Sequence, residues 1–165
     1  MDARIANALE VTTPSDCEIV LTRSFDAPRR LVFAAMTQAE HVRRWYGCDA
    51  FSLTVCDIDL RVGGAYRFTM RSPDGVDHTL HGIYREVSPP DRLVHTEAYV
   101  TEGFSSDAAL VTSVFAETDG RTTLTVTILH TCRENRDMHL GSGMERGAGE
   151  AYDRLAAVVQ SMAVA

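Results

Sequence analysis

Residues 142–162, SGMERGAGEAYDRLAAVVQSM, carry the longest helical pattern in this chain. Their apolar residues follow one another at steps of one, three or four, namely Met144, Ala148, Ala151, Tyr152, Leu155, Val159 and Met162. These steps place them in one stripe along an α-helix, with the charged residues on the other side. Ser142 followed by Glu145 matches a capping box, so we expect the helix to begin at Ser142. At about 20 residues the helix would be roughly 30 Å long, enough to cross a small domain.

Seven stretches outside this helix have the β-branched and aromatic content of strands: residues 18–25, 51–59, 65–71, 79–87, 92–100, 109–117 and 121–130. Turn sequences such as SPDG at 72–75 and TDG at 118–120 separate several of them. Two short helices are predicted after the first strand. One runs to Thr37, with Asp26 as its N-cap and Pro28 in its first turn, and the other covers 39–45. This order predicts an α+β fold in which a curved antiparallel sheet covers one long helix.

The composition is that of a single soluble globular domain, because 165 residues, 45% hydrophobic and 24% charged, are ordinary values for one. We expect the domain to span 16–165 and residues 1–15 to form a tail or a short docking segment. The formal charge of −7 argues against nucleic acid or an anionic membrane as the partner. Residues 1–15 lack the pattern of a signal peptide, and no stretch approaches the ~20 apolar residues of a membrane span. A cytoplasmic protein without membrane insertion is therefore expected, and a homodimer is left open.

No metal or cofactor is expected. The cysteines form no C-x-x-C pair, which favours reduced thiols over a disulfide framework: Cys17, Cys48, Cys56 and Cys132. No histidine pair has the i, i+4 spacing of a helical metal site, so a metal-free cavity is favoured: His78, His81, His95, His130 and His139. The chain also contains no phosphate-binding loop, dinucleotide fingerprint or nucleophile elbow.

Several short motifs, weak one by one, occur in a specific order across residues 20–160. They are FDAP at 25–28, WYG at 45–47, DIDLR at 57–61, GG at 63–64, GIYREV at 82–87, PPDRL at 89–93, TE at 96–97, RD at 136–137, GME at 143–145 and YDRL at 152–155. In this order the chain resembles the activator-of-heat-shock-ATPase-homologue-like branch of the START/Bet v 1-like (SRPBCC) superfamily. The resemblance implies a helix-grip fold, in which a seven-stranded sheet grips the C-terminal helix and encloses a cavity. Superfamily members include lipid carriers, cyclases, receptors and hydrolases, so the fold does not fix the function.

The register of the hairpin formed by 79–87 and 92–100 decides which side chains line that cavity. If Val87 lies opposite Leu93, one face of the sheet carries a polar group made up of His81, Arg85, His95, Glu97 and Tyr99. Hydrophobicity alone would bury the opposite face, which carries Tyr84, Val94, Ala98 and Val100. The resemblance favours the first face, because relatives often have large apolar side chains at the matching positions. We expect the first face to point inward. The alternative is a solvated face with cross-strand charge pairs.

His130 is in phase with Leu124, Val126 and Ile128, so we expect its side chain to point inward at the end of the last strand. It is interpreted either as a hydrogen-bonded core residue or as an acid or base lining the cavity. Gly143, Gly147 and Gly149 in the long helix indicate either close packing on the sheet or room at the cavity mouth.

Together these arguments predict a ligand-binding set: Trp45, Tyr46, Phe68, Met70, His81, Arg85, His95, Glu97, Tyr99, Phe115, Val126, His130, Met144, Ala148 and Tyr152. Candidate catalytic residues within it are His81, His95, Glu97 and His130.

The residue set and the resemblance together leave three functions open. The first is the binding of a small, largely apolar or aromatic molecule between sheet and helix. The second is a metal-free cyclase, isomerase, lyase or hydrolase acting on a polyketide-like or aromatic compound in the same cavity. The third is a co-chaperone-like or metabolite-sequestering interaction module. Whether the protein is an enzyme is left open.

Overall fold

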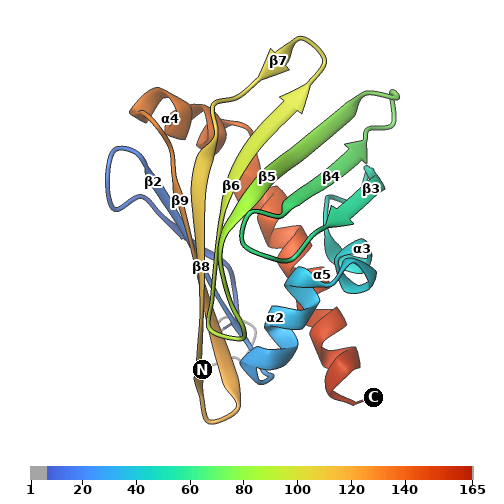
Figure 1. Ribbon diagram of the computed structural model, residues 1–165, viewed down its shortest axis with the longest axis vertical. Coiled ribbons are helices and arrows are strands. Elements are labelled where there is room, and N and C mark those ends of the chain that lie inside the picture. The colour runs from blue at the N-terminus through green and yellow to red at the C-terminus, as the bar shows by residue number, and fades with distance from the viewer. Residues whose placement is uncertain (1–6, 165) are drawn as a thin grey trace.

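The computed structural model describes residues 7–164 and has the predicted α+β architecture, a curved antiparallel sheet wrapped around a long C-terminal helix (Figure 1). All seven predicted strands are confirmed, with small shifts at their ends: β2 (Glu18–Phe25), β3 (Ser52–Ile58), β4 (Ala65–Arg71), β5 (Asp77–Ser88), β6 (Arg92–Thr101), β8 (Ala109–Thr118) and β9 (Arg121–Leu129). Two short strands, β1 (Glu10–Thr12) and β7 (Phe104–Ser105), bring the sheet of the described residues to nine. Its order is β1-β2-β9-β8-β6-β5-β4-β3, with β7 on the edge of β6.

The short strand β1 lies in the segment for which a tail or a docking segment was expected. It pairs antiparallel with β2 through Glu10 and Thr22, Val11 and Leu21, and Thr12 and Val20. Residues 10–12 therefore dock on the sheet, and residues 1–6 lie outside the described residues.

The three predicted helices have the expected positions, but the caps predicted for two of them are wrong. α2 (Arg29–Thr37) and α3 (Ala39–Trp45) lie between β2 and β3, and α4 (Arg133–Gly141) leads into α5 (Met144–Ala163). Asp26 does not cap α2, because the N-cap is Pro28, and its end makes no side-chain cap bond. The capping box predicted at Ser142 is also wrong. Gly143, at φ +83°, turns the chain between the two helices, and Ser142 instead donates its hydroxyl to the His139 carbonyl, 2.6 Å away, at the end of α4.

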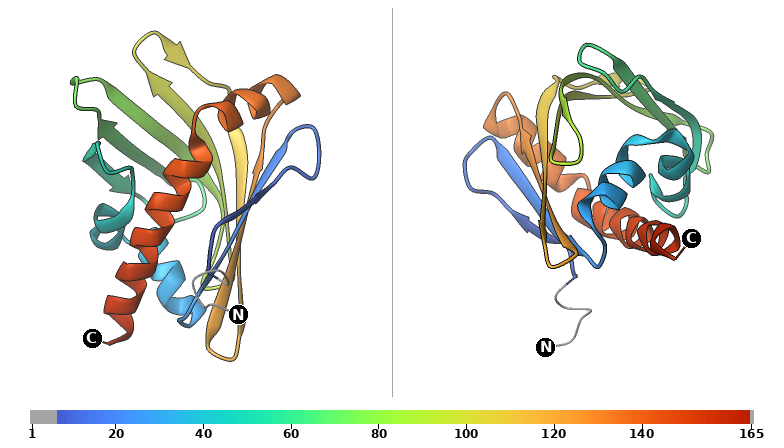
Figure 2. Two further views of the ribbon diagram at one scale, coloured as in Figure 1. Left: turned by 180° about the vertical axis from the view of Figure 1, so that it is seen from behind. Right: turned by 60° about the horizontal axis from the view of Figure 1, so that its bottom comes forward.

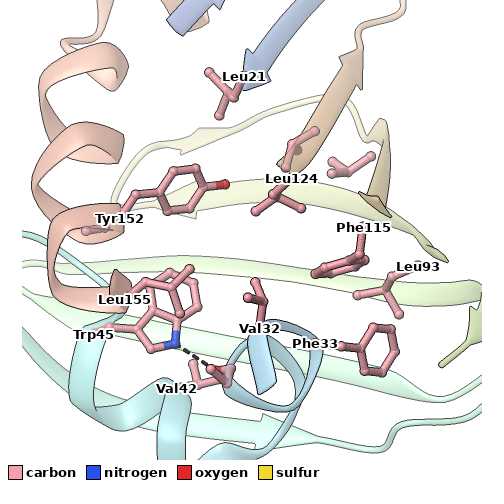
Figure 3. Packing of buried hydrophobic residues seen from close by; sticks show 14 of the residues in the cluster. Leu21, Val32, Phe33, Val42, Trp45, Leu93, Phe115, Leu124, Tyr152 and Leu155 are labelled. Carbon is pink, nitrogen blue, oxygen red and sulfur yellow. Dashed lines mark hydrogen bonds between the residues drawn. The ribbon is translucent and has the colours of Figure 1, made fainter. Parts of the chain in front are cut away.

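Helix α5 lies across the concave side of the sheet, with α2 and α3 beside it (Figure 2). Its buried stripe is Ala151, Tyr152, Leu155, Val158 and Val159, in the C-terminal two thirds of the helix. Figure 3 shows the core that this stripe forms with α2 and the sheet. Phe115 and Phe33 meet edge to face there, with ring centroids 5.2 Å apart. Each fully buried side chain of this size contributes roughly 1.5–3 kcal/mol, so this end of the interior is a packed core.

A β-bulge at Arg85 changes the register of the β5–β6 hairpin. Val87 pairs with Leu93 as predicted, but the register shifts between Tyr84 and Glu86, and Tyr84 then pairs with His95. The predicted pairing of Arg85 with His95 is therefore wrong. A bulge inserts one residue into one strand only, so every side chain of β5 that precedes it changes face.

The bulge separates the five polar side chains that were expected to share one face. His95, Glu97 and Tyr99 of β6 lie on the concave face, where His95 pairs with the buried Tyr84 of β5. His81 pairs with Ala98 on the convex face, and Arg85 is exposed. The inward placement predicted for these two residues is wrong.

Candidate functional site

Glu97 is the centre of the candidate site. It lies on the concave face of β6, and burial raises the pKa of its carboxyl to about 7. Burial, and after it the charge of Glu97, raises the pKa of three tyrosines: Tyr46 at the end of α3, Tyr66 on β4 and Tyr152 on α5. Side chains from three other elements therefore lie near enough to this carboxyl group of β6 for its charge to act on them. The low dielectric around it favours the neutral acid.

The polar side-chain atoms of Glu97, Tyr46 and Tyr152 have no hydrogen-bond partner in the protein, but they are not completely shielded from solvent. Within residues 7–164, the carboxylate of Glu97 and the hydroxyls of Tyr46 and Tyr152 make no hydrogen bond to protein. Over the same residues, the Nε of Arg23 is the one side-chain nitrogen or oxygen that is shielded from solvent and also makes no hydrogen bond. The three groups near Glu97 therefore keep contact with solvent-accessible space. Polar groups that lack a protein partner and touch solvent are of the kind found at ligand sites.

The first turns of α5 are less covered by other parts of the chain than the rest of the helix. Met144 and Ala148 continue the inward stripe but are only half-buried. A Cβ atom added at Gly147 would meet no atom within 4 Å, and the same holds at Gly149. Close packing of these glycines on the sheet, one of the two interpretations of the sequence, is therefore wrong. Small residues here leave this part of the helix uncovered.

Tyr66 and His95 are held by the backbone at the bulge. The Thr96 carbonyl oxygen accepts the Tyr66 hydroxyl at 2.7 Å and lies 3.0 Å from the His95 Nδ1. A carbonyl can only accept, so the His95 Nδ1 carries the proton and its Nε2 is an acceptor when the ring is neutral. Burial lowers the pKa of His95, which favours the neutral ring. Gly82 permits this arrangement, since its Cβ would lie 1.9 Å from the Thr96 oxygen and 2.8 Å from the Tyr66 ring.

Tyr46 is positioned by contacts between α3 and α5. Its ring lies 4.7 Å from that of Phe68, and Trp45 lies 5.7 Å from it and 6.2 Å from Tyr152. The Trp45 indole donates to the Ala35 carbonyl at 2.8 Å. Arg154 of α5 donates to the carbonyls of Trp45 and Gly47 and to the carboxylate of Asp49. These bonds fix the end of α3 against the helix.

Tyr99 lies further along β6, in a row of rings that the sequence did not predict. Its hydroxyl is 2.5 Å from the Nδ1 of His78, and His78 stacks on Phe51 at 5.3 Å. His78 faces inward because it pairs with Met70 on β4, whose alternation buries Tyr66 and Phe68. The bulge gives His78, not His81, a place on the concave face.

The remaining predicted site residues lie elsewhere. Phe115 and Val126 are 1% and 5% exposed in the packed core. His130 is half-buried, with its Nε2 3.0 Å from the Nδ1 of His139 on α4. It shares a row with Glu97 across β8, but two strand spacings, about 10 Å, separate them.

Besides His78, two interior residues were missed by sequence reasoning. Tyr66 alternates with Phe68 and Met70, and that pattern alone could have added it to the set. Arg23 sits at an inward position of β2 and is 7% exposed. Alternation with Leu21 and Phe25 indicates this, but a buried arginine runs against residue preference.

Features that could indicate another kind of site are either not found among the described residues or lie outside the Glu97 region. Among residues 7–164, no three His, Cys, Asp or Glu side chains are grouped so as to hold a metal ion. None of the described helices is long and apolar enough to span a membrane. A surface pocket of about 300 Å³ lies between β2 and the end of α5, lined by Asn7, Ser24, Phe25, Asp26, Ala156, Val159 and Gln160. It contains none of the predicted site residues.

Comparison with known proteins agrees with the fold. A protein from Rhodobacter sphaeroides is 25% identical over 94% of this chain and 99% of its own, with a TM-score of 0.87. One from Nitrosomonas europaea is 21% identical over 93% and 100%, with a TM-score of 0.81. The AHSA1 protein from Silicibacter pomeroyi is 19% identical over 88% and 99%, with a TM-score of 0.73. A search of curated proteins found no match. Residues 26–160 match the model of the Activator of Hsp90 ATPase homolog 1-like protein family, and the chain therefore belongs to this family of the SRPBCC/Bet v 1-like superfamily.

Proposed function

We propose that this protein binds a small, largely apolar or aromatic molecule between the sheet and the first turns of α5. The observation that carries the proposal is the enclosed but unsealed group of Glu97, Tyr46 and Tyr152, which have no protein hydrogen-bond partner among the described residues. Buried polar groups are almost always satisfied, so a set left without partners at one place is typical of a ligand site.

The surroundings of this group favour an apolar ligand. Phe68, Trp45 and Met70 supply apolar surface on one side, and Met144 and Ala148 do so from the helix. Ligand pockets are mostly apolar with a few convergent polar groups, and this composition matches.

The test is the binding of a neutral apolar dye, Nile red, followed by its fluorescence. Ala148→Phe would fill the space beside Gly147 and should lower dye affinity by about tenfold or more. Ala157→Phe is the matched control, because it makes the same change on the exposed face of the same helix. His81→Ala and Arg85→Gln on the convex face should also leave dye binding unchanged. A wild-type protein that excludes the dye, or an Ala148→Phe variant that binds it normally, would contradict the proposal.

Catalysis in the same region is the second candidate, favoured by a carboxyl group whose pKa lies near 7. Such a group can both take and give a proton at neutral pH, as a cyclase, isomerase, lyase or hydrolase requires. The protein would be incubated with a panel of β-keto and aryl ester compounds, and products measured by mass spectrometry. Turnover that Glu97→Gln abolishes while dye binding persists supports the role. Equal turnover in both proteins removes Glu97 from the chemistry.

A further inference from the structure

The Glu97 region has a carboxyl group but no positive charge to balance it. The chain contains no lysine. Burial is the sole cause of the raised pKa of Glu97, and no ion pair within residues 7–164 involves it. The buried Arg23 pairs with Asp153, and Arg154 is directed to Asp49 and two backbone carbonyls. An enclosed acid of this kind gains most from a ligand that brings the missing positive charge.

The neighbouring polar groups can all accept a hydrogen bond. The Tyr46 and Tyr152 hydroxyl oxygens and the ionised Glu97 carboxylate can each accept a hydrogen bond, as can the His95 Nε2. A primary ammonium group carries three N–H donors and no acceptor, so it complements these atoms. A carboxylate or phosphate ligand would meet no cation here and would be repelled by Glu97.

Two further features favour a cation with an aromatic body. The centroid of the Tyr46 ring lies 4.7 Å from that of Phe68 and 5.7 Å from that of Trp45, and aromatic rings attract cations. The protein's formal charge of −7 raises the local concentration of cations and lowers that of anions.

We propose that the Glu97 region takes an aryl-alkyl primary amine, with its ammonium group bound by the Glu97 carboxylate and the Tyr46 and Tyr152 hydroxyls. This inference rests on the proposed function, since it names the class of molecule bound in the same region. The aryl group would lie among the apolar side chains between β4 and α5.

Four ligands with one common body separate the alternatives: 4-phenylbutylamine, 4-phenylbutanol, 4-phenylbutyrate and butylbenzene. Each would be titrated against wild-type protein by displacement of Nile red and by isothermal calorimetry. At pH 8 the amine should bind about tenfold or more tighter than the alcohol, and the butyrate should bind most weakly. From pH 8 to pH 6 the amine should lose about tenfold in affinity as Glu97 takes up a proton, while the alcohol changes little.

Glu97→Gln should abolish the preference for the amine and keep butylbenzene binding, which verifies that the variant is folded. Tyr152→Phe should weaken amine binding by a smaller factor. Arg85→Gln, on the convex face of the neighbouring strand, is the control and should behave as the wild type. An amine that binds no tighter than the alcohol, or a preference that survives Glu97→Gln, overturns this inference while the proposed function stands. Failure of the dye and of all four compounds to bind overturns both.

Discussion

The guanidinium of Arg23, on the concave face of β2, lies 2.6 Å from the carboxylate of Asp153 on α5. Arg23 is 7% exposed and Asp153 is 75% exposed, so a buried cation meets an acid at the surface. The guanidinium also lies 5.5 Å from the Phe25 ring centroid. This pair connects the first long strand to the C-terminal helix, far apart in the sequence.

Removal of Asp153 should therefore destabilise the protein more than removal of an ordinary surface acid. Asp153→Ala leaves the Arg23 charge buried without its partner, and we expect the free energy of unfolding to fall by on the order of 1–2 kcal/mol. Glu150→Ala is the control on the same helix, because Glu150 pairs with the exposed Arg146 and should cost under about 0.5 kcal/mol. Urea denaturation measures both. If both variants lose the same free energy of unfolding, burial of Arg23 does not make its pair with Asp153 stronger than the surface pair.

Glycine should be required at Gly82 and dispensable at Gly149. An alanine Cβ at Gly82 would lie 1.9 Å from the Thr96 carbonyl oxygen, a backbone atom that cannot move aside cheaply. Gly82→Ala should lower the free energy of unfolding by about 2 kcal/mol or more. Gly149→Ala meets nothing within 4 Å and should raise it by about 0.5–1 kcal/mol, because alanine favours a helix interior. Thermal unfolding of both variants tests the contrast, and a tolerated Gly82→Ala would contradict the close approach at the bulge.

The Glu97 carboxyl should make the protein less stable as the pH rises. Burial raises its pKa in the folded state from 4.5 to about 7, so the folded protein holds this proton more tightly than the unfolded chain. Its contribution is fully present below pH 4.5 and is lost as the pH rises through 7. Between these values the wild type should lose on the order of 2 kcal/mol relative to Glu97→Gln, measured by urea denaturation across that range. Parallel stability curves for the two proteins would place the Glu97 carboxyl in water.

The His139 ring should make the protein less stable as the pH falls, which is opposite to the effect of Glu97. Burial, and then the neighbouring His130, lowers the pKa of His139 from 6.5 to about 4. The folded state therefore favours the neutral ring. Its contribution is present above pH 6.5 and is lost as the pH falls through 4. His139→Gln should reduce the loss of stability over this range by on the order of 2 kcal/mol. NMR titration of the His139 ring provides a direct check, and a midpoint near 6.5 would refute the prediction.

The main elements of the fold could be predicted from the sequence because their patterns are local. Alternation along 18–25 and 65–71 gave strands whose ends agree with β2 and β4, and the 3.6-residue pattern gave α5. The predicted positions of α3 and the chain order of the elements are also confirmed. Each of these depends on neighbours a few residues apart, where side-chain periodicity is sufficient.

The composition of the candidate site could be predicted only in part. Glu97, His95 and Tyr99 lie on the concave face, as the resemblance suggested and hydrophobicity alone did not. His81 and Arg85 lie on the other face, because the bulge at Arg85 shifts the alternation of β5. The shift exists only in the pairing of β5 with β6, and the close approach of Gly82, Thr96 and Tyr66 beside it joins three strands, so no local pattern contains it.

The sequence by itself thus determined the helix, the strands and their order, since these follow from periodicity and turn residues along the chain. Only the tertiary structure decided which side chains face α5, that Arg23 is buried and pairs with Asp153, and that the charge of Glu97 acts on Tyr46, Tyr66 and Tyr152. The physical reason is that a single inserted residue reverses the faces of a strand. The inserted residue is defined by the pairing of one strand with another, which the pattern of a single strand does not contain.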